Sequence, residues 1–223
     1  MKPLVVLPPL KGEWNVLNTP GDKVPSHGTH KWGMTYAYDF YRLEDKHENT
    51  SWHRKPHMHY CLGQVRLSDA YGWGEPIYSP VDGVVREVVS SVKEPRRLNL
   101  VCDVGRILLN GLFFSYERGE VAKLSGNYLI IENEQCCALL AHAKKDSIKP
   151  EVGDVISAGQ HIADVGHSGN SSVPHLHFQI MDRVDVKAAQ GLPCCFSTYD
   201  IRTEKGWEKV DCGVPGSQFR IRF

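Results

Sequence analysis

Short apolar runs, broken at close intervals by glycine and proline, constrain the fold of this chain most. Its 223 residues include 20 glycines and 13 prolines. Each run has the length of a strand rather than of a helix. The runs that we expect to form strands are 84–89, 128–132, 137–142, 155–156, 161–165 and 175–180. The pattern predicts a mainly β protein with antiparallel strands.

Turn residues and longer insertions separate these runs. A polar break at 133–135 predicts a β-hairpin, and residues 158–160 predict another tight reversal. We find no long segment with helical periodicity, and residues 106–112 are too short to indicate a helix. Residues 42–60 and 90–126 are therefore expected to be loop insertions in the sheet.

The composition is ordinary except for its histidines. Hydrophobic residues make up 41% of the chain and charged residues 23%, as in typical globular proteins. Lys+Arg and Asp+Glu number 26 each. This balance removes the electrostatic case for nucleic acid or an anionic membrane as the main partner. The 11 histidines, however, invite a search for metal ligands.

The first residues predict no targeting segment. Residues 4–7 are apolar, but Pro8 and Pro9 close the run, whereas a secretory signal needs about 7–15 apolar residues. No apolar run approaches the roughly 20 residues that span a bilayer. We therefore expect a cytoplasmic protein without a membrane span, and leave export by an unrecognised route open.

Two histidines alternate in the run 174–178. Side chains alternate along a strand, so His175 and His177 point to one face, about 6–7 Å apart. Two imidazoles at this spacing can address a single site, one binding a metal while the other reaches water bound to it. Alone, such a pair is more often two exposed histidines on an edge strand.

Asp39 adds a carboxylate to this pair. In the run 36–40, three aromatic residues share one face and leave Asp39 on the other, where burial is costly unless it is paired or binds a metal. Further candidates are His27 and His30 upstream, and His142 at the end of an apolar strand. The set predicts a His/Asp zinc site, in which three protein ligands leave a fourth position for water.

The order of the motifs resembles the lysostaphin-type zinc endopeptidases, which cut peptide cross-links in bacterial cell walls. The resemblance covers about residues 25–196 of a single domain, 1–223, with 197–223 as a C-terminal extension. It rests on SHGT at 26–29, YAYDF at 36–40, GEPIYSPVDGVV at 74–85, GNYLII at 126–131, LAH at 140–142, VGDVISAGQ at 152–160, GHSGNSS at 166–172 and PHLHF at 174–178. It implies an antiparallel sheet with a duplicated hybrid motif, and one zinc ion per chain.

The resemblance also assigns roles. Asp39 and His177 match zinc ligands of the family, and His142 and His175 match its catalytic histidines. Zinc would lower the pKa of its bound water to about 7 and polarise the scissile carbonyl. One of the two catalytic histidines would take a proton from that water, and the other would steady the oxyanion. The sequence leaves open which histidine does which.

The third ligand departs from the common pattern. It is usually a histidine four positions before the aspartate, but Thr35 stands there in this chain. A variant branch of the family carries Ser-His-Gly-Thr further upstream, with the intervening residues looped out. The resemblance to that branch implies His27 as the ligand, and His30 is the alternative.

The expected function is hydrolysis of a peptide, most directly a peptidoglycan cross-link, but the sequence does not identify the bond. The alternative is an inactive family member that serves as a scaffold or activator of another wall hydrolase. The complete ligand set favours catalysis. A biotinyl- or lipoyl-carrier domain is disfavoured, because residues 164–167 carry no lysine.

Other histidines are expected to lie outside the site. The insertion 42–60 contains His47, His53, His57 and His59, and its last two repeat the spacing of the 175/177 pair. No strand carboxylate accompanies them, so we expect a solvated loop rather than a second metal site. Another histidine, His167, lies in a turn and is expected at the surface.

Overall fold

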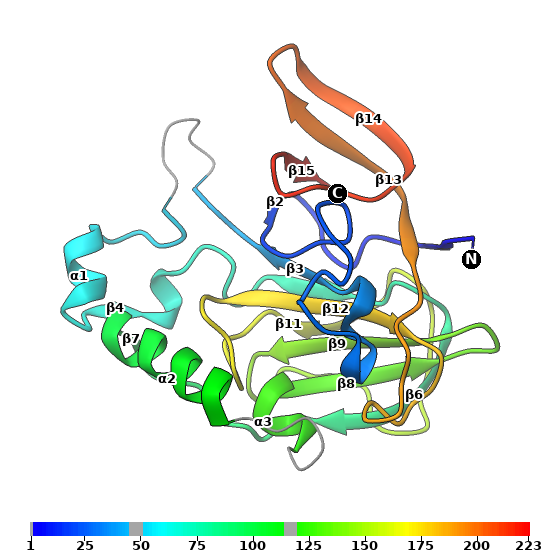
Figure 1. Ribbon diagram of the computed structural model, residues 1–223, viewed down its shortest axis with the longest axis horizontal. Coiled ribbons are helices and arrows are strands. Elements are labelled where there is room, and N and C mark those ends of the chain that lie inside the picture. Colours follow the sequence, from blue (N-terminus) through cyan, green and yellow to red (C-terminus); the bar gives the residue numbers. More distant parts are fainter. Residues whose placement is uncertain (1, 45–50, 114–119) are drawn as a thin grey trace.

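The apolar runs of the sequence lie side by side in one large sheet (Figure 1). The computed structural model describes residues 2–44, 51–113 and 120–223, so His47 lies outside the described residues. The main sheet is built from β1 (Leu4–Val6), β2 (Glu13–Val16), β3 (Tyr38–Tyr41), β6 (Gly83–Val89), β8 (Asn127–Glu132), β9 (Cys137–Ala143), β10 (Val155–Ile156), β12 (His175–Met181), β13 (Cys194–Thr203), β14 (Gly206–Gly213) and β15 (Arg220–Arg222).

The spatial order of these strands differs from their order in the chain. It runs β1-β13-β15-β2-β3-β12-β9-β8-β6-β10, with β14 paired to β13 outside this path. Neighbouring strands are antiparallel except for β1 and β13, which are parallel. The prediction of a mainly β, antiparallel fold is confirmed.

Smaller elements surround the main sheet. Two short sheets pair β5 (Pro76–Tyr78) with β11 (His161–Asp164), and β4 (Val65–Arg66) with β7 (Arg97–Leu98). The helices are α1 (His57–Cys61), α2 (Leu100–Phe113) and α3 (Val121–Ser125), and the 3-10 helices are η1 (Lys31–Tyr36) and η2 (Leu67–Asp69).

The prediction that no helix forms between residues 90 and 126 is wrong. Helix α2 begins at Leu100, well before the apolar stretch 106–112. Asn99 explains this start, because its Oδ1 accepts hydrogen bonds from the backbone N–H groups of Val101 (2.9 Å) and Cys102 (3.2 Å). Such a cap satisfies N–H groups that have no partner within the helix. Helix α1 likewise occupies part of the insertion 42–60 that was expected to be a loop.

Strand β12 lies at the centre of the sheet, between β3 and β9. Its Leu176, Phe178 and Ile180 point into the larger hydrophobic cluster, together with Tyr38 and Phe40 of β3. The opposite face carries His175, His177 and Gln179, followed by Met181 in a second cluster. On this face of β12 the polar residues 175, 177 and 179 lie beyond the edge of the second hydrophobic cluster, and they form the candidate site.

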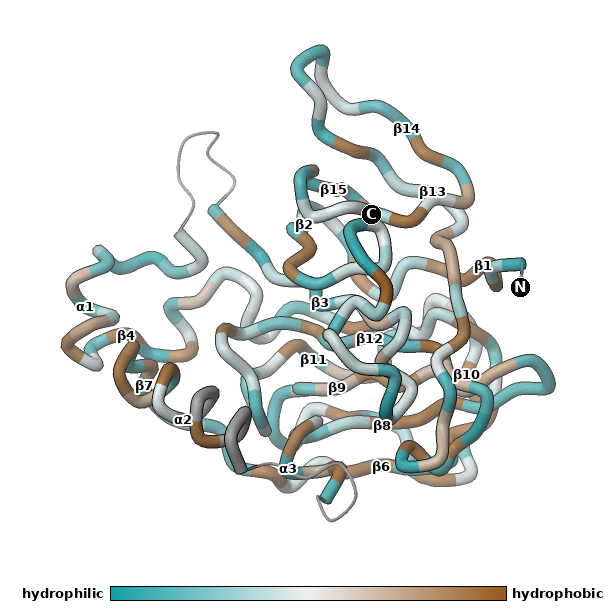
Figure 2. The backbone as a smooth tube through the Cα atoms, viewed as in Figure 1, coloured by the Kyte–Doolittle hydropathy of each residue, from teal (hydrophilic) through white to brown (hydrophobic). Residues whose placement is uncertain are grey.

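The C-terminal segment is joined to the same sheet. Strand β13 pairs with β1, and β15 pairs with both β13 and β2, while the β13–β14 hairpin projects away from the body (Figure 1). Figure 2 shows polar and apolar residues mixed along the chain. Among the described residues, no helix has both the length and the apolar character needed to cross a membrane.

Candidate metal centre and active site

The pairing of β3 with β12 sets the position of the first two site residues. In this register His177 lies directly opposite Asp39. Directly opposite residues of an antiparallel pair point to the same face of the sheet. On the other side of β12, His177 is opposite Ala141 of β9. The residue after Ala141 is His142, which lines the same cleft as His177. His142 has a left-handed backbone (φ 60°).

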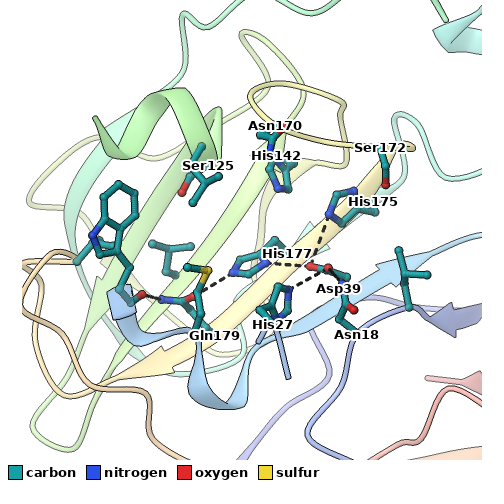
Figure 3. Close-up of a pocket in the computed structure, with 16 residues that line it drawn as sticks. Asn18, His27, Asp39, Ser125, His142, Asn170, Ser172, His175, His177 and Gln179 are labelled. Atoms are coloured by element: carbon teal, nitrogen blue, oxygen red, sulfur yellow. Dashed lines mark hydrogen bonds and ion pairs between the residues drawn. The ribbon is translucent and has the colours of Figure 1, made fainter. Parts of the chain in front are cut away.

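His27, Asp39 and His177 converge on one point (Figure 3). His27 Nε2 lies 3.0 Å from Asp39 Oδ2, and His177 Nδ1 lies 2.9 Å from Asp39 Oδ1. One nitrogen or oxygen atom from each residue falls within 4.8 Å of the other two. Asp39 and His177 are buried, and His27 is half-buried. No second group of this kind occurs in the part of the chain that the structure describes.

This donor set fits a zinc ion. Two imidazole nitrogens and one carboxylate are typical zinc ligands, and a tetrahedral shell with bonds of about 2.0–2.2 Å places its ligand atoms roughly 3.3 Å apart. The observed separations of 2.9 and 3.0 Å are close to that value. A set of three leaves a coordination position open, as catalytic sites require.

A pair of histidines, His142 and His175, lies beside the His27–Asp39–His177 cluster. Their ring centroids are 4.6 Å apart. His142 Nδ1 donates to the backbone carbonyl of Ser168 (2.8 Å), and His175 Nδ1 lies 2.7 Å from the carbonyl of Val173. A carbonyl oxygen only accepts, so each Nδ1 carries the proton and each Nε2 is left for the site. His175 Nε2 is 3.5 Å from Asp39 Oδ1.

The buried charges shift the pKa values of these groups in opposite directions. Burial acts to raise the pKa of Asp39, but the charges of His27 and His175 and the hydrogen bonds from the histidines hold it well below its usual value. Burial acts to lower the pKa of His177, but Asp39 raises it overall. Burial and the neighbouring histidines hold the pKa of His142 well below its usual value, so this ring stays neutral.

The alternative ligand, His30, is not part of the cluster. It is exposed, and its Nδ1 lies 3.1 Å from Thr35 Oγ1. Gly28, next to His27, has a left-handed backbone (φ 71°), which turns the chain sharply between the two histidines. The structure therefore brings His27, and not His30, next to Asp39.

The structure contradicts the expectation for one of the other histidines and limits that for the insertion 42–60. His167 is fully buried rather than at the surface, and its Nδ1 lies 3.0 Å from Ser171 Oγ. In the insertion 42–60, His53 is buried against Trp52 and Tyr60, whereas His57, in α1, is exposed as expected and His59 is half-buried. The backbone N–H of His167 also donates to Glu94 Oε1 (2.7 Å), so its burial involves a segment 73 residues away that local patterns do not indicate.

Sequence reasoning missed three polar residues that contact the cluster. Asn18 Nδ2 donates to Asp39 Oδ2 (2.6 Å), Ser26 Oγ bonds His27 Nδ1 (3.0 Å), and Gln179 Oε1 lies 2.9 Å from His177 Nε2. Alternation along β12 could have identified Gln179, because it follows His177 by two residues. Asn18 has no such signal, since its position depends on the packing of a loop against β3.

A cleft of about 250 Å³ contains these side chains. Figure 3 shows the four histidines with Asp39 and Asn18 in its lining. The lining also includes the apolar residues Trp32, Met34, Leu124, Leu139 and Val186. The arrangement is suited to hold a metal ion beside the imidazoles of His142 and His175 and apolar side chains.

Comparison with family models gives a match over part of the chain. Residues 111–189, about a third of the chain, match the model of Peptidase family M23. The resemblance to the lysostaphin-type peptidases is confirmed. The M23 match contains His142, His175 and His177, whereas His27 and Asp39 precede it.

Several solved structures are similar to the chain. A zinc-containing peptidase from Vibrio cholerae is 28% identical over 50% of this chain and 24% of its own, with a TM-score of 0.32. The prophage-encoded M23 protein EnpA of Enterococcus faecalis, as a variant of its catalytic domain, is 23% identical over 56% of this chain and 70% of its own (TM-score 0.36).

The catalytic domain of lysostaphin, an antimicrobial peptidase from Staphylococcus simulans, is 18% identical over 82% of this chain and 88% of its own, with a TM-score of 0.39. The chain spans about a quarter of the length of the Vibrio cholerae peptidase that it matches. No curated protein matches the chain.

Proposed function

We propose that this protein is a zinc-dependent metalloendopeptidase that hydrolyses peptide bonds in peptidoglycan cross-links. One observation carries the proposal: His27, Asp39 and His177 meet at a point that also faces His142 and His175. The M23 match supports a peptidase, since it contains three of these five residues.

In this proposal His27, Asp39 and His177 hold one zinc ion per chain. The ion would supply Lewis acidity, which polarises the scissile carbonyl and makes water more acidic. Asp39 is suited to its place because its low pKa keeps the carboxylate ionised. Asn18 donates to the same carboxylate and so limits its rotation.

His142 and His175 handle the proton. Each ring has its Nδ1–H group directed to a backbone carbonyl, and thus offers Nε2 to the reacting groups. One Nε2 accepts a proton from the attacking water, and the other, when protonated, donates a hydrogen bond to the oxygen that gains negative charge. Their burial limits the access of bulk water to this exchange.

The substrate is proposed to lie along the cleft. A peptide bond placed beside the His27–Asp39–His177 cluster and the His142/His175 pair would bring a flanking residue to apolar side chains of the cleft lining, such as Trp32, Met34 and Leu139. We also propose that residues 1–223 act as one peptidase domain, because β1, β13 and β15 belong to the same sheet as β3 and β12.

Digestion of purified peptidoglycans tests the function. Sacculi with different cross-bridges are incubated with the zinc-loaded protein, and the released fragments are identified by mass spectrometry. We expect new peptide termini at one type of bond, and none with His142→Ala or after zinc removal. Intact cross-links with every substrate, in a protein that binds zinc, would favour the inactive scaffold or activator instead.

A further inference from the structure

The segment between His27 and Asp39 is an ordered part of the site. The resemblance implied that these residues are looped out, but Lys31–Tyr36 form η1, and its Trp32 and Met34 are buried (3% and 7% exposed). Trp32 and Gly33 have left-handed backbones (φ 57° and 73°). The backbone carbonyls of η1 accept hydrogen bonds from Gln179 and Ser26, which lie beside the cluster.

Gly33 allows η1 to approach β12 closely. A Cβ atom at this position would lie 2.8 Å from Gln179 Nε2 and 2.7 Å from Met181 Cγ, both shorter than normal contacts. Glycine is therefore required there by space as well as by its φ angle. The close approach brings the Trp32 carbonyl to β12, on the face that carries His177.

The first contact fixes the ring of His177. Gln179 Nε2 donates to the carbonyl of Trp32 (2.8 Å), which directs Gln179 Oε1 toward His177 Nε2, 2.9 Å away. The amide oxygen only accepts, so His177 carries a proton on Nε2. The carboxylate of Asp39 also only accepts, so Nδ1 donates to Asp39 Oδ1 (2.9 Å) in the metal-free protein; this is the proton that a metal would displace, which leaves Nδ1 as the nitrogen that can bind it.

The second contact fixes the ring of His27 in the opposite sense. Ser26 Oγ donates to the carbonyl of Met34 (3.3 Å) and accepts from His27 Nδ1 (3.0 Å). The backbone N–H of Ser26 also donates to the carbonyl of Thr35 (3.1 Å). With the proton on Nδ1, His27 offers Nε2, the atom 3.0 Å from Asp39.

We propose that η1 is a positioning element, whose carbonyls act through Ser26 and Gln179 to select the metal-binding nitrogen of His27 and His177. The proposal rests on the proposed zinc function. Residues that hydrogen-bond a metal-ligating histidine fix its tautomer, and their loss typically costs about 10–100-fold in metal affinity. Ser26 and Gln179 are thus positioning residues that need not touch the substrate.

Zinc affinity of matched variants provides the first test. Gln179→Met and Ser26→Ala remove the hydrogen bonds with little change in volume, and Gln160→Met and Ser157→Ala make the same changes in an exposed turn. Competition with a chromophoric chelator measures the affinity, and the unfolding of each zinc-free variant shows whether it is folded. We expect a loss of about 10–100-fold for the first two variants and parental affinity for the controls.

Nitrogen-15 NMR of the zinc-loaded parent provides the second test, which does not depend on any variant. We expect a proton on Nε2 of His177 and on Nδ1 of His27. The opposite nitrogens, or parental zinc affinity in both folded variants, would overturn the positioning role while leaving the peptidase proposal intact. A parent protein that binds no zinc would overturn both.

Discussion

At the scale of single residues, Asp39 is the residue that links the histidines of the candidate site. Its carboxylate is buried in a central strand, and three histidines lie within 3.5 Å of its oxygens. An isolated carboxylate at such a position would be protonated, because burial disfavours the charge. The surrounding imidazoles reverse this effect, so it is the residue types, and not the burial alone, that make the site suited to a metal ion.

Alanine substitution of the two upstream histidines separates the ligand from its neighbour. We expect His27→Ala to lower zinc affinity by orders of magnitude, since it removes one of three ligands. His30→Ala should keep parental affinity, because His30 contacts Thr35 and lies outside the cluster. Chelator competition on both variants gives the answer, and the reverse ranking would show that His27 is not the ligand.

His142→Ala separates chemistry from metal binding. The ring lies beside His175 and is not one of the three clustered ligands, so zinc content should remain parental. The rate of peptide hydrolysis should fall by about two to four orders of magnitude, the usual contribution of a positioned acid or base. Hydrolysis at near the parental rate would show that His142 is structural.

Acidification should release zinc through His177. Asp39 raises the pKa of His177 in the metal-free protein, so a proton competes with zinc at a higher pH than for an ordinary histidine. Zinc affinity is therefore highest above the pKa of His177 and falls as the pH drops through that pKa, while Asp39 stays ionised. Elemental analysis after gel filtration at stepped pH measures the release; zinc content that is unchanged down to pH 4 would contradict the expectation.

At the scale of elements, alternation predicted the strands because it is a local property of the sequence. It placed His175 and His177 on one face of β12, and the direct pairing of β3 with β12 brings Asp39 to them. That pairing joins segments more than 130 residues apart, so only the family resemblance indicated it. The structure of η1 was not predictable, since it depends on contacts of Trp32 and Gly33 with β12.

The missed helix α2 yields a prediction about its cap. Asn99→Ala removes the acceptor for two backbone N–H groups and should lower the free energy of unfolding by about 0.5–2 kcal/mol. Asn99→Asp keeps an acceptor oxygen and serves as the control. Urea unfolding followed by circular dichroism measures both, and equal stability of Asn99→Ala and the parent would exclude the cap.

At the scale of the whole molecule, the sheet explains why distant motifs act together. Its central strands carry Asp39, His142, His175 and His177, and the loop before η1 adds His27. The apolar side of β12 packs against Tyr38 and Phe40, which fixes the strand that carries two of the histidines. The core packing beneath the strand thus supports the positions of the side chains that we propose as metal ligands.

The zinc content of the purified protein tests the central claim most directly. Elemental analysis of the parent, Asp39→Ala and His177→Ala should give about one zinc per chain for the parent and essentially none for either variant, with all three folded. Full zinc occupancy in both variants would contradict the assignment of His27, Asp39 and His177 as the metal centre.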